Sequence, residues 1–257
     1  MANVPKKVLE RLGDGLKRFQ PILSAAKARD AGESDTVTII TDMLNVLFGY
    51  DKYSEVTSEH AIRGTFCDLA IKVQDQLLLL IECKSIGLDL KEAHLKQAID
   101  YATNKGVDWA VLTNGHIWRV YKVKFTKPID QELVAQFDLL TINPKDSEQL
   151  EALFILCKEG WQKDAISDFY GQSQMLSRFS LGAAILSEPV LESIRRELRK
   201  AYEDAPLFQI EDIHRIISAE VLKREVLEGP QAQDAIKKLA KLSRERKKQE
   251  PPAGSTQ

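Results

Sequence analysis

An acid and a lysine, Glu82 and Lys84, stand two positions apart at the end of an apolar run, Leu77–Ile81. A continuous apolar run of this length is typical of a buried strand. Because side chains two apart on a strand project from the same face, the carboxylate and the ammonium group are expected to lie side by side. Two other acid-x-lysine tripeptides, at 89–91 and 245–247, do not follow such a strand. The sequence therefore favours the first tripeptide as a chemical site.

Asp68 supplies a second carboxylate from the preceding predicted strand. We take residues 74–76 as a three-residue hairpin loop, which pairs Val73 with Leu77. Counting back along both strands then places Asp68 opposite Glu82. Two carboxylates that face each other across a ladder repel, and a cation between them would remove that cost. A hard divalent ion such as Mg²⁺, with Mn²⁺ as a possible substitute, suits such oxygen ligands.

Lys84 completes a set of groups suited to phosphodiester hydrolysis. Its ammonium group can orient or deprotonate the attacking water and offset the charge of a phosphate. The next predicted helix, 90–104, carries Gln97 and Tyr101 on one face, since they are four residues apart. These two side chains are expected to line the same groove and to contact a phosphate or a base.

The remaining pattern predicts the elements that position these groups. An amphipathic helix begins near Val4 and is expected to end near Pro21, and a second helix is expected to follow to Arg29. The turn Asn114-Gly115 predicts a hairpin, because both residues tolerate a positive φ. The order of helix, two strands, helix and two strands predicts an α/β fold (an α+β mixed sheet) with a C-terminal helical extension. Strands are predicted at 66–73, 77–84, 109–113 and 116–123, and the first core helix at 35–48.

The 257 residues suffice for one domain and an accessory element. We divide them into an N-terminal amphipathic helix (1–30), a nuclease core (31–145), a helical accessory region (146–228) and a charged, disordered tail (229–257). Helices of the accessory region are predicted at 147–158, 189–201 and 210–227.

Composition excludes several classes of protein. The three cysteines have no paired metal-ligand spacing, which indicates packing residues in a reduced, cytoplasmic protein. No apolar window is long enough to cross a bilayer, so no membrane partner is expected. A net charge of −2 restricts any nucleic-acid contact to local clusters of basic residues. A phosphate-binding loop of the Walker type is absent, and with it an ATP-driven motor.

The ordered motif set resembles the N-terminal nuclease domain of type I restriction R subunits. It is closer still to small stand-alone, predicted type IV-like restriction endonucleases. The resemblance covers roughly residues 33–140, and Cys67 stands where the PD-(D/E)xK pattern has proline. The motifs that carry it are Asp68, Ile81-Glu82-Cys83-Lys84, Gln97-x-x-x-Tyr101, Leu112-Thr113-Asn114-Gly115, Trp118 and Tyr121.

The resemblance implies a restriction-endonuclease-like core and a Mg²⁺-dependent DNA endonuclease of restriction or anti-phage defence. It carries catalytic roles to Asp68, Glu82, Lys84, Gln97 and Tyr101. Family members also tend to place a metal-binding acid on the first core helix, a place that Glu33 or Asp35 would fill. The helicase of a type I R subunit is missing, which leaves room for further defence-system subunits, and double-strand cutting suggests a homodimer.

Plainer interpretations stay open. Glu82 and Lys84 can be an exposed cross-strand ion pair, and Gln97 and Tyr101 an ordinary helix face against the sheet. The histidines at positions 60, 94, 116 and 214 are best read as surface or packing residues. The alternative function is a non-catalytic nucleic-acid-binding or sensor module on a nuclease fold, and a protein-interaction scaffold is a third.

Overall fold

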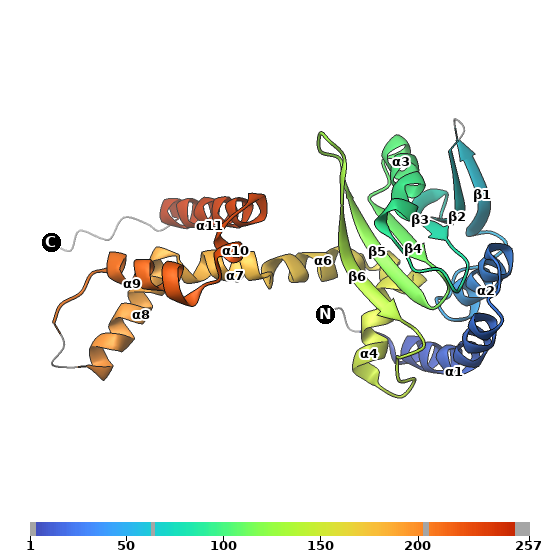
Figure 1. Ribbon diagram of the computed structural model, residues 1–257, viewed down its shortest axis with the longest axis horizontal. Coiled ribbons are helices and arrows are strands. Elements are labelled where there is room, and N and C mark those ends of the chain that lie inside the picture. The colour runs from blue at the N-terminus through green and yellow to red at the C-terminus, as the bar shows by residue number, and fades with distance from the viewer. Residues whose placement is uncertain (1–3, 63–64, 203–205, 250–257) are drawn as a thin grey trace. The chain divides into compact units, whose positions relative to one another are not determined.

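The computed structural model describes residues 4–62, 65–202 and 206–249. The chain forms two compact units, Met1–Tyr170 and Gly171–Gln257, which are described separately. In the first unit, helices cover both faces of a twisted sheet (Figure 1). The second is entirely helical in its described residues. No helix in the described ranges is long and apolar enough to span a bilayer.

The sheet of the first unit has six strands in the order β1-β2-β3-β4-β5-β6. Only β3 and β4 run parallel, and the other neighbours are antiparallel. This mixed sheet with its helices confirms the predicted fold class. The strands are β1 (Val56–Ile62), β2 (Thr65–Val73), β3 (Gln76–Cys83), β4 (Trp109–Thr113), β5 (Ile117–Lys124) and β6 (Asp130–Asp138).

The hairpin between β2 and β3 differs from the predicted one. Its loop has two residues, Gln74 and Asp75, both with positive φ, so Val73 pairs with Gln76 and not with Leu77. A bulge between Ile71 and Lys72 then shifts the register by one residue. The two differences cancel, and the pair Leu69–Ile81 has the register that the three-residue loop had predicted.

Two helices cover one face of the sheet. They are α1 (Lys6–Ala28) and α2 (Glu33–Val46). Contrary to the prediction, α1 does not end at Pro21 but runs through it. The proline removes one backbone donor, but the buried stripe continues beyond it with Leu23, which packs in the same core as Leu16. Tertiary packing therefore outweighs the local cost.

A short 3-10 helix, η1 (Glu92–Leu95), and α3 (Lys96–Lys105) lie on the opposite face. Ala70 of β2 and Leu80 of β3 pack against this layer. Because strand side chains alternate, Asp68 and Glu82, each two positions from one of these residues, are expected on the same face. The two acids thus lie on the side of the sheet that carries α3, whereas Glu33 belongs to α2.

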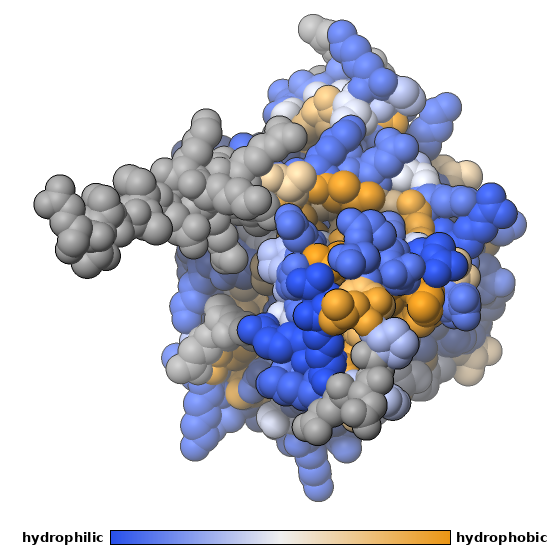
Figure 2. Space-filling model, turned by 90° about the vertical axis from the view of Figure 1, so that its left-hand side faces the viewer, coloured by the Kyte–Doolittle hydropathy of each residue, from blue (hydrophilic) through white to orange (hydrophobic). Residues whose placement is uncertain are grey.

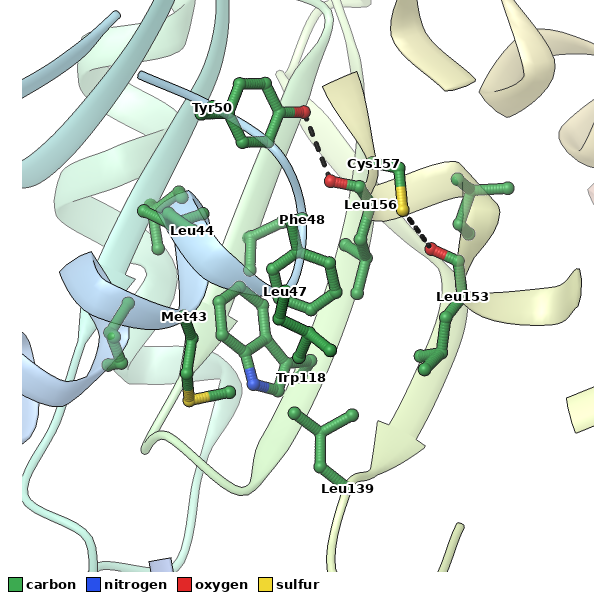
Figure 3. Packing of buried hydrophobic residues seen from close by; sticks show 14 of the residues in the cluster. Met43, Leu44, Leu47, Phe48, Tyr50, Trp118, Leu139, Leu153, Leu156 and Cys157 are labelled. Carbon is green, nitrogen blue, oxygen red and sulfur yellow. Dashed lines mark hydrogen bonds between the residues drawn. The ribbon is translucent and has the colours of Figure 1, made fainter. Parts of the chain in front are cut away.

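Aromatic side chains fill the core on the side of α1 and α2 (Figure 3). The rings of Phe48 and Trp118 pack edge to face, with their centroids 5.0 Å apart. The Tyr50 hydroxyl donates to the Leu156 carbonyl at 3.1 Å. Cys83 and Cys157 are fully buried in this cluster and Cys67 in the cluster on the α3 side, so all three cysteines are packing residues as predicted. Three short helices close this end of the unit: α4 (Ser147–Ala152), η2 (Leu153–Leu156) and α5 (Lys158–Gln162).

Strands β1 and β6 were not predicted. They are the two edges of the sheet, and β6 is partly or fully exposed along its whole length, so it shows no apolar run. The hairpin between β4 and β5 forms at Asn114-Gly115 as predicted: Gly115 has a positive φ (+90°), and the Asn114 side chain accepts from the Ile117 amide at 2.9 Å.

The second unit is a set of helices with little buried apolar surface. Large hydrophobic side chains among its described residues are exposed, for example Met175 (69%), Leu207 (81%) and Val221 (66%). Figure 2 looks at the side of Figure 1 where α8 and α9 are drawn and shows hydrophobic residues gathered between hydrophilic ones. The helices are α6 (Ala165–Met175), which crosses the boundary between the units, α7 (Arg178–Ile185), α8 (Glu188–Ala201), α9 (Ile210–Ile216), a π-helix (Ile217–Val221), α10 (Arg224–Leu227) and α11 (Pro230–Gln249).

One expectation for this unit differs from the structure. The helix predicted at 210–227 is three pieces, because a π-helical turn and a break follow Ile216. The charged tail from 229 begins with a helix, α11, whose Ala232 and Ala235 are buried at helical spacing. Residues 250–257 lie outside the described ranges.

Candidate active site

Glu82 and Lys84 form the centre of the candidate site. The Glu82 side chain is only 2% exposed, and its Oε1 accepts a hydrogen bond of 2.7 Å from Lys84 Nζ. Lys84 Nζ also donates to the Cys83 carbonyl at 2.9 Å. The second oxygen, Glu82 Oε2, is buried and has no hydrogen-bond partner within the described residues. This pair is therefore not the solvent-exposed ion pair of the plainer interpretation.

Asp68 lies beside Glu82 and is held from the opposite strand. The ladder between β2 and β3 ends at Leu69–Ile81, so Asp68 and Glu82 are the next residues on the two strands. Beyond that pair, a side chain replaces a backbone carbonyl as the hydrogen-bond acceptor between the strands. Asp68 Oδ2 accepts from the Cys83 amide at 2.7 Å. The carboxylate is thus fixed by the backbone of the strand that carries Glu82.

Burial and charge set the protonation of this cluster. Burial raises the pKa of Glu82 to about 7, and the nearby carboxylates of Asp68 and Glu33 add to the rise, which the Lys84 ammonium opposes. For Lys84, burial lowers the pKa, but the hydrogen bond to Glu82 and the surrounding carboxylates outweigh it, so the pKa ends above the ordinary value. Lys84 is accordingly a cation at neutral pH.

Of the two acids considered on the first core helix, Glu33 is the one near the cluster. Its Oε2 is 3.7 Å from Lys84 Nζ, and its side chain is half exposed at the first turn of α2. Asp35 instead forms an ion pair with Arg29 at 3.3 Å. Glu33 therefore contacts the cluster through the Lys84 ammonium group, which also binds Glu82.

Gln97 and Tyr101 occupy different environments on α3. Tyr101 is fully buried, and burial together with the nearby Cys67 thiol raises the pKa of its hydroxyl. Gln97 is exposed, and no hydrogen bond recorded for the described residues joins it to the acids or the lysine. His94 accepts from the Lys91 amide at 3.2 Å and caps η1.

The residues present fit a divalent cation. Among the described residues, no three His, Cys, Asp or Glu side chains converge as a ready-made metal site. Mg²⁺, however, is commonly held by one or two carboxylates with water and substrate phosphate as the other ligands. A buried carboxylate oxygen without a partner, Glu82 Oε2, next to a second carboxylate is what such an ion requires.

One segment of the chain is similar to a known protein family. Residues 48–136 match the family described as Type I restriction enzyme R protein N terminus. The match confirms the resemblance inferred from the motifs. No curated protein and no solved structure matches the chain at a significant level.

The R protein N-terminus match begins after α2 and ends within β6. It therefore includes Asp68, Glu82 and Lys84, together with Gln97 and Tyr101 of α3. Glu33 and the whole second unit lie outside it. The role of Glu33 rests on its distance to Lys84 alone.

A polar pocket next to the cluster was not predicted. Its volume is about 430 Å³, and its wall includes residues 86–90, the turn that follows Lys84. Lys27, Asn114 and Arg119 also line it. The R protein resemblance marked Asn114 only as part of a turn motif, and Lys27 lies on α1, outside the matched segment, so neither carried a signal of this site.

His116 is a buried structural residue of this pocket. Nδ1 lies 3.2 Å from Asp138 Oδ1, and Nε2 lies 3.2 Å from Lys27 Nζ. Because a lysine ammonium can only donate, Nε2 must accept, and the ring proton sits on Nδ1 and is donated to Asp138. His116 is therefore neutral in this arrangement.

Proposed function

We propose that this protein is a Mg²⁺-dependent endonuclease that hydrolyses DNA phosphodiester bonds, in restriction or anti-phage defence. The observation that carries the proposal is the buried Glu82 carboxylate, with one oxygen bound by Lys84 and the other unpartnered, next to Asp68. Burying a carboxylate oxygen without a partner is costly, and a binding module gains nothing from acids that repel phosphate. Mn²⁺ is expected to substitute for Mg²⁺.

The residues of the cluster divide the work. Asp68 and Glu82 would hold the cation, which when bound would polarise the phosphate and lower the pKa of water. Lys84 is a cation held within 2.7 Å of Glu82, so it orients water and offsets charge on the phosphate. Glu33 restrains Lys84 at 3.7 Å and would contribute to the cation's shell through water. Gln97, exposed on α3, and Tyr101 support the substrate-facing side of that helix.

The choice of DNA as substrate is supported by the similarity of residues 48–136 to a restriction-enzyme domain. Further defence-system subunits as partners belong to the same proposal. A homodimer would let two clusters cut two strands.

Plasmid cleavage tests the proposal. Wild-type protein is expected to nick or linearise plasmid with Mg²⁺ or Mn²⁺ and not with EDTA, and Glu82→Ala or Lys84→Ala should reduce the rate by at least about 10³-fold. The matched control is Asp108→Ala or Lys122→Ala, which breaks an ion pair of 2.8 Å at the opposite end of the same sheet. These controls should cut normally. Undiminished cutting by both site variants would disprove the assignment.

The same experiment distinguishes the proposed nuclease from the non-catalytic alternative. A sensor module would bind DNA with a strong salt dependence and would leave duplex, single-stranded and RNA substrates intact under every divalent ion tested.

A further inference from the structure

The polar pocket beside the cluster carries two cations that no carboxylate neutralises. Among the ion pairs of the described residues, none involves Lys27 or Arg119. Many other basic side chains of the described residues also lack an ion pair, but Lys27 and Arg119 line the same pocket, where both charges can act on one ligand.

Neutral groups hold both cations in place. Lys27 Nζ donates to the neutral His116 Nε2 at 3.2 Å, which uses one of its three protons. Arg119 donates through Nε to Gln136 Oε1 and through Nη1 to the Leu90 carbonyl, both at 2.8 Å. Each side chain is therefore oriented without losing its positive charge.

Three acids lie near the pocket. Asp138 accepts the His116 proton at 3.2 Å and is not among the lining residues. Asp89 lines the pocket and Asp30 lies against Gly87 of its wall, and both are exposed, so water screens them. Lys27 is also exposed, whereas Arg119 is partly buried and its charge is less screened.

From this arrangement we infer that the pocket binds a phosphate group of the nucleic-acid strand, next to the phosphate that the cluster attacks. The inference rests on the proposed function for its ligand, but the site is separate from the cluster. Its floor, residues 86–90, follows Lys84 directly and is fixed by Asn114, whose Nδ2 donates to the Leu88 carbonyl at 3.0 Å. A bound phosphate would thus be held in a constant position relative to Lys84.

Salt-dependent binding of an oligonucleotide without divalent ions tests the pocket independently of cleavage. Each phosphate contact contributes about 0.7 to 0.9 to the slope of log K against log salt concentration. Lys27→Gln and Arg119→Gln are each expected to lower the slope by about that amount and to weaken binding about tenfold at low salt. Lys27→Arg and Arg119→Lys keep the charge and should retain the slope. Asp89→Asn should strengthen binding.

Two variants serve as matched controls: Lys122→Gln, at the opposite end of the sheet, and Arg178→Gln, in the second unit. Both should leave the slope unchanged. Thermal melting of every variant checks folding, and Lys27→Gln covers the case in which Arg119→Gln fails to fold.

The outcomes distinguish this site from the nuclease proposal. Reduced slopes in a protein that never cuts DNA would support the pocket and reject the nuclease. Normal slopes for both Gln variants in a protein that does cut would overturn the pocket. Inorganic phosphate that raises the melting temperature of the wild type as much as the oligonucleotide does would also overturn it. The ligand would then be a free anion and not a strand.

Discussion

The backbone amide of Cys83 donates a hydrogen bond of 2.7 Å to the Asp68 carboxylate at the point where the pairing of their strands stops. This bond fixes the distance between the two acids without any cation. The site is therefore preorganised by the backbone of β2 and β3.

Substitutions of Asp68 should separate this bond from the charge. Asp68→Asn keeps an acceptor oxygen for the Cys83 amide, whereas Asp68→Ala leaves that amide without one. We expect the alanine variant to be less stable than the asparagine variant by about 1 to 2 kcal/mol in urea unfolding. Both should lose cleavage activity. Equal stabilities would show that the hydrogen bond contributes nothing.

The raised pKa of Glu82 makes stability depend on pH. The folded state holds this proton up to about pH 7, whereas the unfolded chain releases it near 4.5, so the ionised carboxylate costs stability as the pH rises between these values. Glu82→Gln removes the cost. Its advantage in unfolding free energy over the wild type should grow by about 3 kcal/mol from pH 4 to pH 8. Parallel pH profiles for the two proteins would contradict the pKa shift.

A divalent ion should relieve the same cost. Mg²⁺ or Mn²⁺ is expected to raise the melting temperature of the wild type, and to raise it more at pH 8 than at pH 6, because the ion competes with the proton on Glu82. Glu82→Gln and Asp68→Asn should show little response. A response that both variants retain would place the ion elsewhere on the protein.

Asn114 should control the turn that follows Lys84. Its side chain is 3% exposed, donates to the carbonyls of Ile86 (3.3 Å) and Leu88 (3.0 Å), and accepts from the Ile117 amide at 2.9 Å. Asn114→Ala should cost about 2 to 3 kcal/mol. Hydrogen exchange of residues 86–90 should rise more than that of β1. Unchanged exchange there would mean that the turn is held by other contacts.

The sequence predicted the central strands and the cluster because their signals are local. An apolar run ending in Glu82-x-Lys84 can be read without knowing its neighbours. The facing of Asp68 and Glu82 came out right for a partly wrong reason, since the loop is one residue shorter than expected and a bulge restores the count. A bulge depends on how two strands twist together, which no single strand reveals.

The errors share this non-local origin. Helix α1 continues through Pro21 because its apolar face packs against the core. The edge strands β1 and β6 lack an apolar run because each has a neighbouring strand on one side only. The Lys27 to His116 contact joins residues 89 positions apart in the chain, so no spacing rule could find it.

The boundaries of the family match also bear on how this protein can be divided. The matched segment starts at residue 48, yet the face of the sheet behind the cluster is covered by Leu16, Leu23 and Ile40, all from earlier helices. A fragment of 48–136 would expose that face to water and should aggregate, whereas 1–170 keeps it covered. The segment that matches the family is therefore shorter than the smallest unit expected to fold. Only the larger unit, 1–170, is suitable for transferring this chemistry to another protein.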